Sequence, residues 1–290
     1  MSLLSDETLW IFLLNYVGEA SRHVCDVANG ISSLEKQKIK QHNIKLVTDA
    51  NKEILDEYMQ KFTKQNYELN HPNNLEEIVK NTKCENIVVF VFGHGGLEDG
   101  IIGNPSMKPY KFLNILKGNA QTKNIIVYLS QCFAGVFNYV DLNTSPPNIV
   151  FIGATNLYPS ISATTCESGW LANLFLLNLF EWIRNPIDID GDGKCTVIDS
   201  YKYAGAKTNK YCIQCKSYNF EYAIELLKMK KASHEKIGKM ILEHCDKKSI
   251  NLELCNLDAI EAKLNECQTM HYNTQEPWIL NANPAQKIEF

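Results

Sequence analysis

The chain has 290 residues, 45% of them hydrophobic, enough for one large α/β domain with additions or for two smaller domains. Its formal net charge of −4 and pI near 6.0 give no reason to expect nucleic acid or an anionic membrane as a partner. Ten cysteines are too few for a disulfide-stapled secreted scaffold, so we expect reduced thiols and a reducing compartment.

The amino-terminal sequence predicts a protein of the cytoplasm, or one delivered into a host cytosol. Residues 1–7 lack a basic segment and carry Asp6 and Glu7, which is atypical of a secretory signal peptide. The apolar runs at residues 9–17 and 170–183 are too short to span a bilayer. We therefore expect no signal peptide, no transmembrane segment and no membrane partner.

Apolar runs and amphipathic segments alternate along the first two thirds of the chain. The predicted strands cover residues 9–14, 43–47, 87–92, 125–129 and 148–153, and the predicted helices cover residues 20–41, 52–65, 73–81, 109–117 and 167–184. This alternation predicts an α/β fold with a mostly parallel sheet and helices on both faces.

The composition changes after about residue 212. Lysine- and glutamate-rich amphipathic segments at 218–244 and 250–268 predict a helical hairpin. We therefore expect a sheet domain over residues 1–211, a helical addition packed on it over 212–270, and a tail over 271–290 that returns to the domain.

Two of the predicted strands end in polar residues among glycines. Residues 87–92 lead into Gly-His-Gly-Gly with His94, and residues 125–129 lead into Ser-Gln-Cys-Phe-Ala-Gly with Cys132. Neighbouring parallel strands would bring both side chains to one sheet edge, where open α/β sheets place their chemistry. An imidazole beside a thiolate makes an activated nucleophile, so we predict a catalytic dyad. The alternative is a buried cysteine and a loop histidine that end two ordinary strands.

These motifs resemble the caspase–legumain clan of cysteine peptidases. The Gly-His-Gly-Gly segment is closest to the legumain branch, which includes the catalytic subunit of the transamidase that attaches lipid anchors. Residues 22–26 (Arg-His-Val-Cys-Asp) are similar to the Arg-His-x-x-Asp segment of that branch. The resemblance covers roughly residues 9–205 and implies a caspase-like sheet with the helical addition outside it.

The resemblance also implies a role for each motif residue and no cofactor for catalysis. Cys132 would attack a peptide carbonyl, His94 would give a proton to the leaving amine, and the backbone amides of Cys132 and Gly95 would hold the oxyanion. Arg22, with Ser130, would bind the side chain before the scissile bond, which predicts cleavage after Asp or Asn. For Arg22 the alternative is an ordinary surface ion pair.

Two positions depart from the branch. Ala20 stands where the branch often has an asparagine that orients the histidine, so the sequence predicts a dyad rather than a full triad. Ser130 stands where the branch often has glutamate and caspases have glutamine, which leaves the specificity open.

Residues 188–199 (Asp-Ile-Asp-Gly-Asp-Gly-Lys-Cys-Thr-Val-Ile-Asp) match a twelve-residue calcium loop. The shorter Asp in place of the usual Glu at the last ligand position favours weaker binding or magnesium. The alternative is an acidic turn between two helices, but unpaired carboxylates would repel one another, so we predict a structural Ca²⁺ site. Its candidate ligands are Asp188, Asp190, Asp192, the backbone carbonyl of Lys194, and Asp199.

The leading function from sequence is a cysteine endopeptidase that acts on a peptide or protein substrate, with autoprocessing in a loop. A transpeptidase or ligase on the same site is the second hypothesis, because an amine can resolve an acyl-enzyme in place of water. A catalytically silent caspase-like module that binds a partner is the third.

Overall fold

The computed structural model of the protein describes residues 2–15, 21–142, 146–166, 168–272 and 275–290. The chain divides into two units, Met1–Asn209 with Gln275–Phe290, and Lys210–Thr274.

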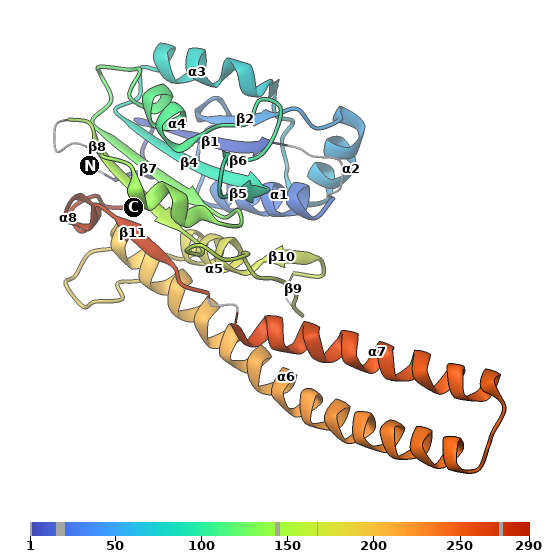
Figure 1. Ribbon diagram of the computed structural model, residues 1–290. Helices are drawn as coiled ribbons and strands as arrows, with labels where there is room; N and C mark the ends of the chain where they lie inside the picture. The colour runs from blue at the N-terminus through green and yellow to red at the C-terminus, as the bar shows by residue number, and fades with distance from the viewer. Residues whose placement is uncertain (1, 16–20, 143–145, 167, 273–274) are drawn as a thin grey trace. The chain divides into compact units, whose positions relative to one another are not determined.

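A seven-stranded sheet forms the centre of the first unit (Figure 1), in the order β11-β8-β7-β4-β1-β2-β3. Every neighbouring pair is parallel except β11, which runs antiparallel to β8. The strands are β1 (Thr8–Asn15), β2 (Ile44–Thr48), β3 (Leu69–Asn70), β4 (Asn86–Gly93), β7 (Asn124–Leu129), β8 (Asn148–Gly153) and β11 (Trp278–Leu280). Two small antiparallel pairs accompany the sheet: β5 (Gly95–Gly96) with β6 (Gly100–Ile101), and β9 (Ser162–Thr164) with β10 (Leu171–Asn173).

The central strands are apolar throughout because both faces of the sheet are covered. Successive side chains of a strand point to opposite faces, so each strand contributes to two cores. On β1 the first core takes Trp10, Phe12 and Leu14, and the second takes Leu9, Ile11 and Leu13.

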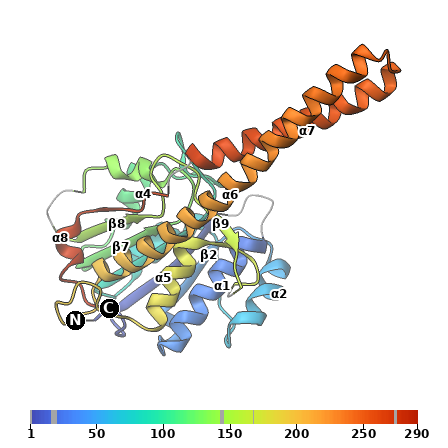
Figure 2. The same cartoon turned by 90° about the horizontal axis from the view of Figure 1, so that it is seen from below.

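Helices cover the sheet on both sides (Figures 1 and 2). The apolar faces of α1 (Ser21–Lys36), α2 (Lys52–Phe62) and α5 (Leu174–Arg184) belong to the first core, and those of α3 (Leu75–Asn81) and α4 (Pro109–Leu116) to the second. The shorter helices are η1 (Gln41–Asn43), η2 (Pro72–Asn74), η3 (Ala134–Tyr139) and α8 (Ala282–Ala285). The predicted α/β fold with a mostly parallel sheet is confirmed.

The helix predicted over residues 167–184 is shorter than expected. Glu167 lies outside the described residues, Leu171–Asn173 form β10, and the helix begins at Leu174. The Asn173 side chain caps the helix by accepting a hydrogen bond from the backbone N–H of Leu176 at 3.1 Å. The prediction extended too far because only Asn173 separates the apolar residues of the strand from the apolar run of the helix.

The second unit is a helical hairpin made of the later part of α6 (Val197–Leu242) and of α7 (Lys247–Tyr272). Its core is small, with Leu226 of α6 facing Ile260, Leu264 and Cys267 of α7. Helix α6 begins well before the predicted start at residue 218, directly after the acidic loop. Among the described residues, no helix combines the length and the apolar character needed to cross a membrane.

Candidate active site

The two strand-end motifs lie at the same edge of the sheet. Strand β4 pairs in parallel with its neighbour β7 (Figure 1), up to Val91 and Leu129. The chain continues from β4 into His94 and from β7 into Cys132. Because parallel strands run in the same direction, the histidine and the cysteine both follow the carboxyl ends of adjacent strands.

The two motifs are in direct contact through Gly95. A Cβ atom at this position would lie 2.0 Å from the carbonyl oxygen of Cys132 and 2.4 Å from Cγ of Gln131. Only glycine allows the chain after His94 to approach the chain at Cys132 this closely. The β5–β6 pair supports this approach, since the N–H of Ile102 donates to the carbonyl of His94 at 3.0 Å.

Cys132 is half-buried, and the loop after β8 supports it. Its Sγ accepts a hydrogen bond from the backbone N–H of Ser160 at 3.3 Å. The next residue, Phe133, has the left-handed φ of 56° and donates its N–H to the carbonyl of Tyr158 at 2.9 Å. Phe133 is also the N-cap of η3, so the strand-end motif passes directly into this short helix.

A second histidine lies against His94. The rings of His23 and His94 have centroids 5.3 Å apart and meet edge to face at 85°. His23 is buried in the first turn of α1, and its Nε2 has no hydrogen-bond partner among the described residues. Burial, together with the charges of Arg22 and His94, lowers the pKa of His23 to about 3, so this ring is neutral at physiological pH.

Arg22 lies beside His23 at the start of α1. Its Nη1 donates to Oγ of Ser162 on β9 at 3.0 Å, which ties the helix to the β9–β10 pair. Among the described residues, no carboxylate forms an ion pair with this guanidinium. The alternative of an ordinary surface ion pair for Arg22 therefore has no partner among the described residues.

Ser130 is buried and turned toward the sheet. Its Oγ donates to the carbonyl of Val91 at 2.7 Å, and its backbone N–H donates to the same carbonyl at 3.2 Å. Its hydroxyl proton is therefore engaged within the sheet, and this side chain offers a ligand at most an acceptor lone pair.

A buried polar network, which sequence reasoning did not assign, connects these elements. Asp26 on α1 accepts hydrogen bonds from Nε1 of Trp170 at 2.9 Å and from the backbone N–H of Asn173 at 3.2 Å. Nδ2 of Asn173 donates to the carbonyl of Ser130 at 3.0 Å and to Oγ of Ser160 at 2.8 Å. Asn173 thus links α1 and α5 to both segments beside Cys132. An asparagine directly before an apolar helical run is a capping signal that could have identified it.

Asp26 is buried, and this environment changes its protonation. Burial raises the pKa of Asp26 to about 7, although the donors Trp170 and Asn173 and the charge of Arg22 all favour the ionised form. The penalty for placing a charge in the protein interior exceeds the stabilisation by these partners.

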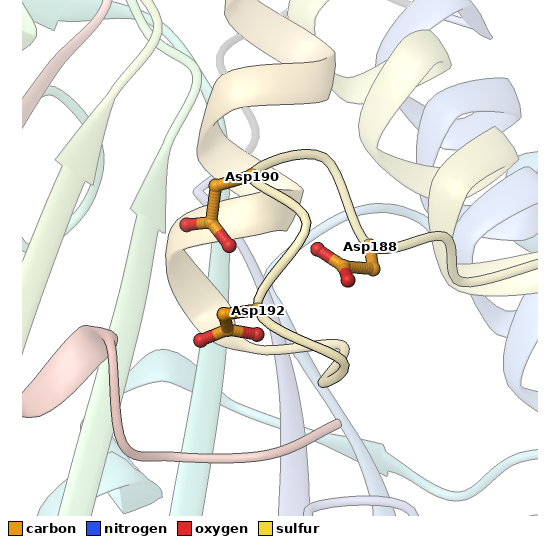
Figure 3. A group of neighbouring side chains, drawn as sticks. All are labelled: Asp188, Asp190 and Asp192. Carbon is orange, nitrogen blue, oxygen red and sulfur yellow. The ribbon is translucent and has the colours of Figure 1, made fainter.

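The acidic loop brings three of its predicted ligands together. One carboxylate oxygen from each of Asp188, Asp190 and Asp192 lies within 4.8 Å of the others (Figure 3). The Asp188 carboxylate accepts the backbone N–H groups of Gly191 at 2.7 Å and Gly193 at 2.8 Å, and both glycines have positive φ. The loop therefore curls around the first carboxylate, as a cation-binding loop does.

Asp199 and the side chain of Lys194 do not join this cluster. Asp199 is buried at the start of α6, where its oxygens accept the N–H groups of Ile189 and Thr196 at 2.9 Å each. The Lys194 ammonium pairs with Glu289 at 2.8 Å, which leaves its backbone carbonyl as the group relevant to a cation. A second lysine, Lys202, pairs with Asp190 at 2.7 Å and neutralises part of the cluster.

A comparison with protein families shows to which family the chain belongs. The model of the peptidase C13 family matches residues 26–234. The chain belongs to the peptidase C13 family. This is the family of legumain and of the lipid-anchor transamidase, so the resemblance to the caspase–legumain clan is confirmed. Membership of the family supports a cysteine peptidase or a transamidase. The C13 match includes His94, Cys132 and the acidic loop, and it extends into α6, beyond the residues that the motifs covered. No curated protein matches the chain.

Asp26 predicts a measurable dependence of stability on pH. Between about pH 4 and pH 7 the folded state keeps a proton on Asp26 that the unfolded chain, with the ordinary pKa of 3.8, has released. Stability from this group therefore falls as the pH rises, by at most ~1.4 kcal/mol per pH unit. Urea unfolding of the wild type and of Asp26→Asn at pH 4.5, 5.5 and 6.5 should show that the wild type loses stability relative to the variant as the pH rises.

His23 has the opposite dependence, because its lowered pKa means that stability is lost as the pH falls below its ordinary value of 6.5. Both proteins contain His23, so its contribution cancels in the difference. The exposed carboxylate of Asp56 provides the matched control, Asp56→Asn, which should show no such trend. A wild-type-minus-Asp26→Asn difference that stays constant over this range would contradict the raised pKa.

Proposed function

We propose that the protein is a cysteine endopeptidase with Cys132 as the nucleophile and His94 as its acid–base partner. The observation that carries this proposal is the packing of Gly95, the residue after His94, on the backbone of Cys132. Membership of the C13 family supports the reaction class. Cys132 is partly exposed, and its thiol accepts a backbone N–H from Ser160 in the described structure, which fits a nucleophile that a substrate must reach.

The reaction follows from these groups. The Cys132 thiolate attacks the peptide carbonyl carbon and forms a C–S bond, while the N–H groups of Cys132 and Gly95 bind the oxyanion. The C–N bond then breaks as the His94 imidazolium gives its proton to the leaving nitrogen. In the second half, His94 takes a proton from water, the hydroxide attacks the thioester, and the C–S bond breaks to release a carboxylic acid and restore the thiolate.

Replacement of the nucleophile tests this assignment. Cys132→Ala should abolish cleavage of fluorogenic peptides, and His94→Ala should lower kcat by roughly 10³-fold or more, since each removes a group that the chemistry requires. Both variants should retain the thermal unfolding midpoint of the wild type. Cys166→Ala, which removes an exposed thiol, is the matched control and should cleave normally. Undiminished cleavage by Cys132→Ala would sink the proposal.

A transamidase on the same site is the second candidate, and the C13 family includes such enzymes. Both reactions share the thioester and differ only in whether water or an amine resolves it. Mass spectrometry of the products with and without an added amine acceptor separates them: a peptidase releases mainly the acid, whereas a transamidase releases mainly the amide.

We further propose that Arg22 selects Asp or Asn before the scissile bond. Arg22 directly precedes His23 in α1, and the ring of His23 contacts that of His94. The planar fork of N–H donors of an arginine suits a carboxylate or a carboxamide. Lysine cannot reproduce this fork, so Arg22→Lys should lower kcat/KM for Asn and Asp substrates by about 10- to 100-fold, equivalent to the ~1.5–3 kcal/mol of a hydrogen bond to a charged group.

The measurement is a fluorogenic panel that varies only the residue before the scissile bond. Arg184→Lys is the matched control, because Arg184 is the only other arginine in the sequence and it bonds Asn29 and Ser33 instead. This control should keep the wild-type preference. Strict cleavage after Lys or Arg by the wild type would refute the role of Arg22.

We also propose that Asp188, Asp190, Asp192 and the carbonyl of Lys194 bind Ca²⁺ in a structural role. The three carboxylate oxygens lie close together, and a cation would relieve their mutual repulsion. Asp199 holds backbone N–H groups instead of facing the cluster, so we expect a weak site, with Kd on the order of 10⁻⁴–10⁻³ M.

Calorimetric titration should therefore show saturable heat with millimolar Ca²⁺ and a rise in the unfolding midpoint. Asp192→Asn should weaken both effects, whereas the exposed control Asp56→Asn should not change them. Peptide cleavage should persist in EGTA, as expected for a structural ion. A wild type that gives neither heat nor a shift in the midpoint at several millimolar Ca²⁺ would remove the site.

A further inference from the structure

In the proposed mechanism the His94 ring faces Cys132, and a hydrogen-bond acceptor behind the ring would hold it there through two proton transfers. In His-dependent hydrolysis a third group fixes the tautomer of the imidazole and stabilises its cation. The asparagine expected from the resemblance is replaced by Ala20, which lies outside the described residues and whose methyl side chain cannot accept a hydrogen bond. A side-chain acceptor must therefore come from another residue.

His23 meets the physical requirements for this acceptor. Its ring contacts that of His94 with centroids 5.3 Å apart, and a linear N–H···N hydrogen bond between two imidazoles places their centroids about 5 Å apart. Its Nε2 is buried and lacks a partner among the described residues, which is costly for a polar atom unless a neighbour turns toward it. The centroid separation already fits the bond, so its formation needs a change of ring orientation rather than of ring separation. Catalytic hydrogen bonds often tighten only when substrate binds.

Electrostatics keep this ring in the form that can accept. Only a neutral imidazole has a lone pair on nitrogen, because both nitrogens of an imidazolium are donors. Burial and the neighbouring charge of Arg22 hold His23 neutral, and a positive charge on His94 disfavours a second charge on His23. His23 therefore stays neutral, keeps its lone pair and carries no catalytic proton of its own.

We propose that His23 is the positioning residue for His94: its Nε2 accepts a hydrogen bond from the ring N–H of His94 that faces away from Cys132. The inference rests on the proposed function in so far as His94 is the acid–base group. It extends the dyad to a Cys132–His94–His23 relay in which the third member is an imidazole and in which no proton leaves His23.

Two substitutions separate a positioning role from a structural or substrate-binding role. His23→Phe keeps an aromatic ring and removes both ring nitrogens, and His23→Gln places a carbonyl oxygen near the position of Nε2. We expect His23→Phe to lower kcat by roughly 100-fold with little change in KM, and His23→Gln to recover most of the loss. His42→Gln, at an exposed histidine, is the control and should behave as the wild type.

A role in the substrate pocket beside Arg22 would instead raise KM and leave kcat near the wild-type value. That result, or an unchanged kcat in a folded His23→Phe protein, would overturn the inference.

Alkylation of Cys132 by iodoacetamide at pH 6.5 provides a readout that needs no peptide cleavage. The rate should fall in His23→Phe toward that of His94→Ala and recover in His23→Gln, because a misplaced His94 no longer stabilises the thiolate. If the wild type cleaves no peptide but shows this order of rates, the proposed function fails and the positioning role stands. Equal rates in the wild type and His23→Phe would refute the positioning role even in an active peptidase.

If His23→Phe does not fold, the wild type itself provides the test. In protein labelled with ¹⁵N at histidine, a scalar coupling between a ring nitrogen of His94 and Nε2 of His23, with a substrate-like aldehyde bound to Cys132, would report the hydrogen bond directly. Absence of the coupling in that complex, with both rings assigned, would overturn the inference.

Discussion

The candidate site depends on the parallel pairing of β4 with β7. This pairing is held by backbone hydrogen bonds and by side chains buried on both faces, so the relative position of the two strands is fixed by the core and not by the loops. A register shift by one residue would exchange the two faces of a strand, which would move apolar side chains such as Phe90 and Val91 to the wrong cores. The same constraint that stabilises the fold therefore fixes where His94 and Cys132 leave the sheet.

The residues at the edge of the sheet where His94 and Cys132 lie are held by a network of buried hydrogen bonds. Asp26, Asn173 and Ser160 connect α1, α5 and the loop after β8 to the chain beside Cys132. In a medium of low dielectric such bonds are strong when they are made and costly when they are lost, so the network rigidifies the site. The raised pKa of Asp26 reflects the cost: the network contains a carboxyl group whose charge is poorly tolerated where it lies.

Charge placement around His94 follows the same logic. Arg22 and His23 are adjacent in the first turn of α1, yet one faces Ser162 of β9 as a permanent cation and the other is buried as a neutral ring. In the proposed mechanism the first turn of α1 therefore serves two purposes: Arg22 recognises the substrate, and His23 orients His94. The calcium loop proposed at residues 188–199 lies at the start of α6, where Asp199 is already engaged with backbone N–H groups, which fits a structural and weak site better than a catalytic one.

The amino-acid sequence was sufficient to predict the fold class, most of the central strands, and the motifs that end two of them. Strands buried on both faces leave unmistakable apolar runs, and glycines beside a polar residue mark where such a run ends. It did not determine the start of α5, because an apolar strand passes directly into an apolar helix and only the capping contact of Asn173 separates them.

Tertiary structure alone decided which polar groups meet at the site. His23 and His94, or Asp26 and Asn173, lie far apart in the chain, and contacts at that separation depend on how helices pack on the sheet rather than on local periodicity. It likewise decided that three aspartates of the acidic loop converge while the fourth turns to cap the following helix. The local sequence pattern specifies the helices and strands. Which side chains meet is decided by burial and by the need of buried polar atoms for hydrogen-bond partners.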